Sequence, residues 1–350
     1  MNKENEPVRQ IPGVGQPQPE QSRASGSATQ PDREQTTDPT KPDLGEAGRG
    51  KDPVRGEESK IEWDSRQRRL VVETKRVLEK ESISEVMIEL AEGEVDVVGT
   101  GEVNKPELIV IQRIYADSEP EAKGFYEKNR SGVNVSTGPK SLYVKGESSS
   151  GVVSGGSENV PTAGGSSQLP RSETQVVLKV PVTKNVNEGE KIKSYIIRVD
   201  SGNIIVENGT GKYDIYAGSG KVVIERCRME ESKIVAGDIE VAGTTFNLCT
   251  ITTVSGNVET TGTTFNLSRI KTKFGNIEAT GIFRGINFVR TESGNILVGF
   301  SNDHGEIEVQ SVLGGRVIEE TIFFKGVKDP NSRKQSILIL ITEAGEIKVI

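Results

Sequence analysis

The chain has 350 residues, a formal net charge of −7 at pH 7, 33% hydrophobic residues and only 5% aromatic residues. The acidic balance argues against general affinity for the phosphate backbone of nucleic acids. The longest apolar run covers residues 337–341 and is far shorter than the roughly 18 residues needed to span a bilayer. Composition therefore disfavours nucleic-acid-coating and membrane-spanning proteins.

Residues 1–58 form the first segment and are rich in Pro, Gln, Glu, Ser, Thr and Gly, with almost no aromatic or β-branched residues. A segment of this composition buries too little apolar surface to offset the entropy of ordering, so we predict a disordered tail. The first 21 residues contain no apolar h-region. We therefore expect no secretory signal and a cytoplasmic location, with association with the cell envelope as the alternative.

Residues 59–350 are expected to form one β-rich domain with three parts. Residues 59–145 contain short β-rich segments separated by Gly, Asn, Pro or Asp, which indicates a meander that leads into or caps the remainder. Within this part, residues 119–129 are predicted to form a short helix. Residues 146–172 are a Gly/Ser-rich flexible loop, and residues 173–350 hold the repeats.

The repeats are marked by Gly-Asn/Asp-Ile/Val tripeptides with a usual spacing of 17 to 19 residues. The tripeptides begin at Gly202, Gly237, Gly256, Gly275 and Gly294. Two repeats share the string GTTFNL, at residues 243–248 and 262–267. A unit this short cannot bury its own apolar face, so successive units must stack.

Aligned on the signature glycines, the repeats place like residues in columns, each of which predicts an inward ladder. The columns are Ile239, Val258, Ile277 and Ile296; Leu248, Leu267 and Ile286; Ile251, Ile270 and Val289; and Thr253, Thr272 and Thr291. Apolar and polar residues alternate within each repeat, which indicates strands. The predicted fold is all-β: a single-stranded, parallel β-solenoid of about seven or eight coils, after a β-rich meander and a disordered N-terminal tail.

One acidic column is the candidate site on this solenoid. Glu240, Glu259 and Glu278 follow the inward column by one residue, so they are expected to point outward. Three interpretations of such a column are open. It binds a divalent cation weakly, it binds a basic partner, or it is a solvated face that keeps the solenoid soluble. No Asp-rich calcium loop accompanies it, so no metal or cofactor is predicted.

Two further columns are interpreted as ordinary structure. Lys271 and Arg290, with Lys273 near, form a basic stripe that we interpret as surface charge, because nucleic-acid sites interleave more basic residues with aromatic ones. Phe246 and Phe265 share a column, and Arg284 is expected to occupy the next position in it. We interpret the two phenylalanines as core or corner packing and not as an aromatic binding surface. The Asn residues at 257, 276 and 295 predict a hydrogen-bonded corner ladder.

Catalytic chemistry has few candidates in this sequence. The single histidine, His304, lies in a turn with no evident nucleophile, so we interpret it as a turn residue. Cys227 and Cys249 occupy different positions of their coils and predict two buried free thiols. The corners between strands are too short to build the walls of a groove flanked by two carboxyl groups. The protein is therefore expected not to be an enzyme.

The order of segments resembles a known family. The strings VMIELAEGEVDVVG, LIVIQRIYA, GVNVSTGPKSLYVKG and VVLKVPV, followed by serial SGNI-type coils, are similar to the bacterial putative-adhesin domains of unknown function, which have a toastrack-like β-solenoid. The resemblance covers residues 84–350. It implies a right-handed solenoid and a role in adhesion or in envelope-stress systems.

These observations predict a non-enzymatic structural or binding module that acts as a scaffold or interaction surface. The expected partner is a protein or a second copy bound through one end of the solenoid, with no nucleic acid and no membrane span. The alternative is a carbohydrate-binding or carbohydrate-active β-helix protein, in which the three glutamates would take part in turnover.

Overall fold

A computed structural model describes residues 57–78, 83–128, 132–146, 170–182, 193–300, 306–313, 316–323 and 336–350, the two segments between 306 and 323 as backbone only. Most of the predicted tail, most of the predicted Gly/Ser-rich loop, and His304 lie outside the described residues. The boundaries predicted between tail, lead-in, loop and solenoid therefore stay predictions.

Up to residue 181, the described part of the chain contains eight strands and one helix. They are β1 (Glu57–Asp64), β2 (Arg69–Val77), β3 (Glu85–Glu92), β4 (Glu94–Thr100), β5 (Glu107–Tyr115), α1 (Glu119–Lys128), β6 (Val133–Thr137), β7 (Ser141–Gly146) and β8 (Arg171–Pro181). The helix predicted over residues 119–129 is confirmed. Its buried Ala122 packs against Leu70, Val72 and Ile114 of β2 and β5.

The remaining strands build the coils and the C-terminal end. They are β9 (Ser194–Ser201), β10 (Ile204–Glu207), β11 (Thr210–Ala217), β12 (Lys221–Glu225), β13 (Arg228–Glu230), β14 (Lys233–Ala236), β15 (Asp238–Ala242), β16 (Thr245–Asn247), β17 (Thr250–Thr253), β18 (Val258–Asn266), β19 (Arg269–Thr272), β20 (Ile277–Arg284), β21 (Ile286–Ser293), β22 (Ile296–Phe300), β23 (Glu306–Leu313), β24 (Arg316–Phe323), β25 (Ser336–Ala344) and β26 (Ile347–Val349).

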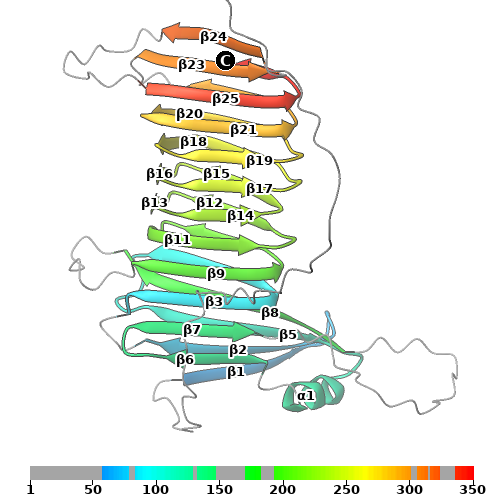
Figure 1. Ribbon diagram of the computed structural model, residues 1–350. Coiled ribbons are helices and arrows are strands. Elements are labelled where there is room, and N and C mark those ends of the chain that lie inside the picture. Colours follow the sequence, from blue (N-terminus) through cyan, green and yellow to red (C-terminus); the bar gives the residue numbers. More distant parts are fainter. Residues whose placement is uncertain are drawn as a thin grey trace, which may run out of the picture. The chain divides into compact units, whose positions relative to one another are not determined.

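Successive coils pair in parallel along two long faces, as Figure 1 shows for the strands from β9 to β21. Face A consists, in spatial order, of β8, β4, β10, β12, β15, β18, β20, β22 and β26. Face B consists of β7, β3, β9, β11, β14, β17, β19, β21 and β25. A narrow third side is made by β13, β16 and parts of β11, β18 and β20. The predicted all-β solenoid is confirmed.

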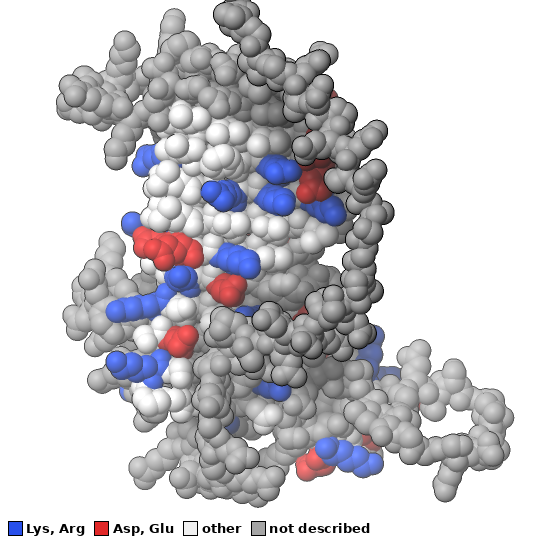
Figure 2. All heavy atoms as spheres, in the orientation of Figure 1, with Lys and Arg blue, Asp and Glu red and all other residues white. Residues whose placement is uncertain are grey.

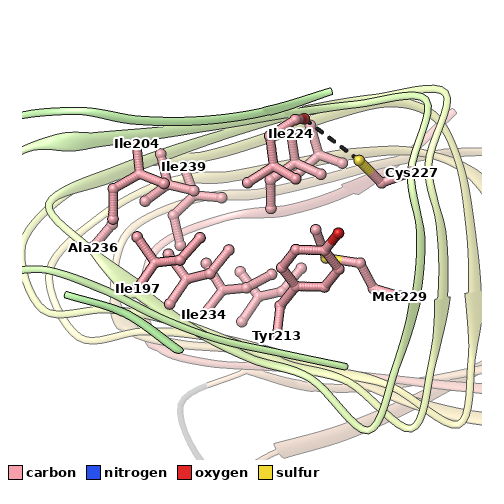
Figure 3. Packing of buried hydrophobic residues seen from close by; sticks show 14 of the residues in the cluster. Ile197, Ile204, Tyr213, Ile224, Cys227, Met229, Ile234, Ala236 and Ile239 are labelled. Atoms are coloured by element: carbon pink, nitrogen blue, oxygen red, sulfur yellow. Dashed lines mark hydrogen bonds between the residues drawn. The ribbon is translucent and has the colours of Figure 1, made fainter. Parts of the chain in front are cut away.

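The interior is filled by ladders of aliphatic side chains from both faces. On face A, Ile239, Val258, Ile277 and Ile296 lie in direct register and are buried, as predicted. The ladder Ile251, Ile270 and Val289 on face B is confirmed in the same way. Figure 3 shows Ile204 and Ile239 of face A opposite Ile197 and Ile234 of face B. The two faces are therefore the two sides of one apolar layer.

Polar ladders hold the corners of the coils. The Oδ1 atoms of Asn257 and Asn276 each accept a hydrogen bond from the backbone N–H of the asparagine one coil above, at 2.9 Å. Asn295 Oδ1 accepts one from Glu346 N at 2.9 Å, so the ladder reaches the last coil. On the inner side, the buried hydroxyls of Thr272 and Thr291 donate to the carbonyls of Gly256 and Gly275. These bonds satisfy backbone groups that a turn would otherwise leave unpaired.

The predicted inward column of Leu248, Leu267 and Ile286 is wrong. Their side chains are 50%, 45% and 45% exposed. Leu248 and Leu267 occupy a corner with φ of 57° and 53°, and the corresponding residue of the next coil is Gly285, with φ of 66°. In this left-handed conformation the side chain points away from the core, and the following small residue, such as Cys249 or Ser268, turns inward instead.

The prediction that Arg284 interrupts the phenylalanine column is also wrong. Residues Phe265 and Phe283 are paired, and their rings stack with centroids 5.1 Å apart. The register between β18 and β20 shifts between Thr260 and Thr263, because β20 has one residue fewer than β18 there. Phe283, and not Arg284, therefore lies next to Phe265. The aromatic column continues from Phe246 to Phe300.

The strained corner gives a prediction about stability. Replacement of Leu267 by asparagine is expected to raise the free energy of unfolding by up to about 1 kcal/mol, because asparagine tolerates positive φ and leucine does not. Urea denaturation measures the change. Val254→Asn is the matched control, since Val254 is 61% exposed and is not among the residues with positive φ, and no gain is expected there. A loss at Leu267 larger than the control would contradict the prediction.

Both ends of the stack depart from sequence order. Strand β3 pairs with β9 on one side and β7 on the other, and β4 pairs with β10 and β8, so the first coil lies between segments that follow it. At the other end β25 lies between β21 and β23. The outermost pairings are antiparallel: β8–β5, β5–β2, β2–β1, β7–β6 and β23–β24.

Candidate functional site

The predicted glutamate column lies on the outer side of face A. Glu240 pairs with Glu259, and Glu259 with Glu278, in consecutive strands β15, β18 and β20. Each glutamate follows a buried residue of the inner ladder, so its side chain points to solvent. The structure thus brings the three carboxylates together in one line along the stack.

The two ends of this column differ in their neighbours. Val223 precedes Glu240 in register, and Leu297 follows Glu278. Lys221 forms a hydrogen-bonded ion pair with Glu240. The hydrogen bond to Glu240 is the main reason why the pKa of Lys221 is raised. Within the described part of the chain, Glu259 and Glu278 form no ion pair. Among the described residues, two of the three carboxylates are therefore without an ion pair.

The column is electrostatically unfavourable on its own. Carboxylates on neighbouring strands about 5 Å apart repel by on the order of 1 to 3 kcal/mol at effective dielectric constants of 80 to 20. The side chains are flexible and exposed, so the actual penalty lies toward the lower end. A cationic group docked against Glu259 and Glu278 would remove part of this repulsion.

The metal interpretation finds little support in the geometry. Across the described residues, no group of three or more His, Cys, Asp or Glu side chains is arranged to hold a metal ion. Each coil contributes one carboxylate to the column, whereas calcium sites gather several oxygens from one loop. The column is better suited to a surface with matching charges than to a single ion.

Face B of the same coils has the opposite charge. Arg269 and Lys271 on β19 point outward, and Lys271 pairs in register with Arg290 on β21. Lys273 follows at the corner, and Figure 2 shows basic side chains gathered on this side of the molecule. Sequence reasoning identified Lys271, Arg290 and Lys273 but missed Arg269. Arg269 could have been found because it lies two residues before Lys271, and every second side chain of a strand points to the same side.

The basic side chains of face B differ in their partners: two lie near aromatic rings, and one forms an ion pair. The Arg269 guanidinium lies 5.3 Å from the centroid of the Phe288 ring, and Lys273 Nζ lies 5.0 Å from that of Phe274. Arg290 forms an ion pair with Glu343 at 2.9 Å. Lys271 has no ion-pair partner in the described part of the chain. Face B therefore presents charge and aromatic surface together.

The two cysteines are structural. Both are buried and free, as predicted, and they lie at different positions of their coils. The Cys227 thiol donates to Val206 O at 3.4 Å, and Figure 3 shows it turned toward the interior. Burial raises the pKa of the Cys227 thiol to about 11 and also raises the pKa of Cys249. Neither thiol is activated as a nucleophile.

Comparison with known proteins identifies the family. The model of the Toastrack DUF4097 family matches residues 115–316, and the chain belongs to this family. This assignment agrees with the predicted resemblance to bacterial putative-adhesin domains of unknown function with a toastrack-like β-solenoid. No curated protein matches the chain. The described residues include no helix that is long and apolar enough to cross a membrane.

Several solved structures are similar to the chain. A putative adhesin from Bacteroides fragilis NCTC 9343 is 12% identical, with a TM-score of 0.42, over 79% of this chain and 97% of that one. A putative lipid binding protein from Parabacteroides distasonis ATCC 8503 is 12% identical, with a TM-score of 0.37 and the same coverage. A putative cell adhesion protein from Clostridium sporogenes ATCC 15579 is 15% identical, with a TM-score of 0.20, again over 79% and 97%.

Proposed function

We propose that the domain is a non-enzymatic binding module that acts as a stiff scaffold and presents its charged strand faces to a partner. The observation that carries the proposal is the in-register column of Glu240, Glu259 and Glu278, two members of which have no counter-ion among the described residues. A cationic partner that met Glu259 and Glu278 would relieve the repulsion between them and supply the missing counter-charge.

The interior of the domain supports a scaffolding role. Ladders of aliphatic and aromatic side chains run through successive coils, with hydrogen-bonded polar ladders at the corners. Each coil is fixed by its two neighbours, so the outer side chains are held at regular intervals of about 4.8 Å along the stack. A partner then meets a preorganised row of charges and pays little ordering entropy.

The same geometry favours binding over hydrolysis. Glycoside hydrolysis uses two carboxyl groups placed on opposite sides of the bond that is cleaved. Glu240, Glu259 and Glu278 lie side by side on one strand face and point in one direction. This arrangement suits the recognition of repeated positive charge, and the proposed partner of the column is therefore cationic.

Binding of a cationic probe tests the proposal. Polylysine titrated into the full chain at low ionic strength, with calorimetric detection, is expected to bind. Glu259→Gln combined with Glu278→Gln is expected to weaken it about tenfold, since each lost contact is worth somewhat under 1 kcal/mol. Binding should also weaken at about 0.15 M salt, where the screening length falls to about 8 Å.

The matched control removes the same amount of charge elsewhere. Glu102 and Glu127 are exposed and lie outside the column, so Glu102→Gln with Glu127→Gln changes the net charge equally. Polylysine affinity that falls equally in both double variants would show that only net charge matters. That result would contradict a binding role for the column.

A further inference from the structure

We propose that the cationic partner of face A is face B of a second copy of this chain, so that copies pack side by side with an offset of one coil. This inference rests on the proposed function and names its partner. The same coils carry an acidic outer column on one face and a basic one on the other. Every copy therefore holds both halves of the contact.

The centre columns of the two faces are defined by strand register. From β4 to β22 the centre column of face A is Asp96, Ile205, Val223, Glu240, Glu259, Glu278 and Leu297, and it continues to Val177 on β8 and Lys348 on β26. The centre column of face B is Glu89, Arg198, Tyr216, Val235, Thr252, Lys271, Arg290 and Ile341. These residues alternate with the buried ladders, so both columns point outward.

A simple translation brings these columns together. Faces A and B are opposite sides of one apolar layer (Figure 3), so the outer side of face A in one copy meets the outer side of face B in a copy displaced sideways. The strands of the two faces then lie nearly aligned, which is the usual arrangement of packed sheets about 10 Å apart.

An offset of one coil makes the two columns complementary. It places Glu259 opposite Lys271 and Glu278 opposite Arg290. Asp96 lies at the level of Arg198, but its Oδ2 already accepts a hydrogen bond from Gln175 at 2.7 Å, so the two glutamates carry the charge match. The same offset also matches apolar residues with each other. The apolar pairs are Ile205 with Tyr216, Val223 with Val235, and Leu297 with Ile341, while Glu240 meets Thr252 and keeps its own partner Lys221.

Other offsets fit less well. With no offset, Asp96 faces Glu89, and Leu297 faces Arg290. With an offset of two coils, Glu278 faces Ile341, and Asp96 faces Tyr216. Of the offsets of zero, one and two coils, the single-coil offset gives the best match of charge and hydrophobicity along the centre column, and mismatches of this kind set register between surfaces.

The adjoining columns agree with the same offset at most positions. Strands of the two faces run in opposite directions, so the end of a face A strand meets the start of a face B strand. Glu225 then lies opposite Lys233, and Val98 lies opposite Ile196. Two pairs are of like charge: Glu94 with Asp200, and Glu207 with Asp214. The members of the second pair each have a cation within their own chain, since Arg226 lies 3.6 Å from Glu207 and Arg198 lies 4.0 Å from Asp214.

The size of the contact indicates a weak, salt-dependent association. Seven strands at about 4.8 Å and three outward residues per strand give a face of about 34 by 14 Å. Counted on both copies this is about 1,000 Å², near the lower limit for a specific interface. The contact joins two different surfaces by translation, so it does not close and each added copy offers a new face.

Light scattering of the full chain tests the inference. The weight-average mass at low ionic strength is expected to rise above the monomer mass of 37.9 kDa with increasing protein concentration and to fall toward it at about 1 M salt. Two charge-reversed variants are compared. The first is Glu259→Lys with Glu278→Lys, and the second is Lys271→Glu with Arg290→Glu.

The inference predicts that each reversed variant alone stays monomeric and that an equimolar mixture of the two associates again. In the mixture, the new lysines of one variant face the new glutamates of the other. Arg228→Glu with Glu230→Lys, on the third side of the coil, is the control and should associate like the unaltered chain. Thermal unfolding of each variant verifies folding, since Arg290 also pairs with Glu343.

The outcomes separate this inference from the proposed function. A chain that stays monomeric at all concentrations but binds polylysine through Glu259 and Glu278 overturns self-association and leaves the proposed function standing. A chain that does neither overturns both. Association that survives in each reversed variant alone places the contact elsewhere and also overturns the inference.

Discussion

Replacement of Gly256 by alanine is expected to lower the free energy of unfolding by at least about 3 kcal/mol. A Cβ atom at this position would lie 1.6 Å from the carbonyl oxygen of Gly237, one coil below. The obstacle is backbone that is itself fixed in the parallel stack, so the coils must separate locally. Urea denaturation followed by circular dichroism measures the loss.

The control for this substitution separates steric overlap from backbone strain. Gly262 has φ of +59° and open space around the position of a Cβ atom. Gly262→Ala is expected to cost only about 1 kcal/mol, from the left-handed conformation alone. Equal losses at the two positions would contradict the view that close approach of successive coils is what requires glycine at position 256.

Replacement of Phe265 by alanine is expected to destabilise the domain by about 3 to 5 kcal/mol. Phe265 is 1% exposed and stacks between Phe246 and Phe283, with ring centroids 5.7 and 5.1 Å away. Truncation leaves a cavity in the middle of the aromatic column, where neighbouring coils cannot collapse into it because their strands are held on both sides. The loss includes two stacking contacts of about 0.5 to 1.5 kcal/mol each.

The same measurement on Phe274 serves as the control. Phe274 is 56% exposed at a corner, so Phe274→Ala is expected to change the free energy of unfolding by no more than about 0.5 kcal/mol. A Phe265→Ala variant as stable as this control would mean that the column does not behave as a packed core. Unchanged denaturant slopes are required for the comparison.

The central coils were predictable from the sequence because their pattern is local and repeated. Alternation placed Ile239, Val258 and Ile277 inside, and their direct stacking is confirmed. The two errors, the inward placement of Leu267 and the loss of the aromatic column at Arg284, have related causes. Alignment of the repeats at a fixed spacing of 19 residues reveals neither the left-handed corner at Leu267 nor the one-residue register shift before Phe283, because neither feature changes the hydrophobic pattern.

The two ends were less predictable than the middle. Nothing in the residues of β3 and β4 indicates that β7 and β8 lie beyond them, because those contacts join segments far apart in the sequence. For the candidate site, alternation was sufficient to place Glu240, Glu259 and Glu278 in one outward line. The ion pair between Lys221 and Glu240 was missed because it crosses between adjacent columns of neighbouring strands.

The insertion of β9 between β3 and β11 has a consequence for the order in which the chain folds. Central coils join residues 19 positions apart, as in the asparagine ladder, so they close short loops and can form early. Strand β3 must wait for β9, and β25 must enter between β21 and β23. We therefore expect the central coils to form first and the two ends of the stack to be completed last.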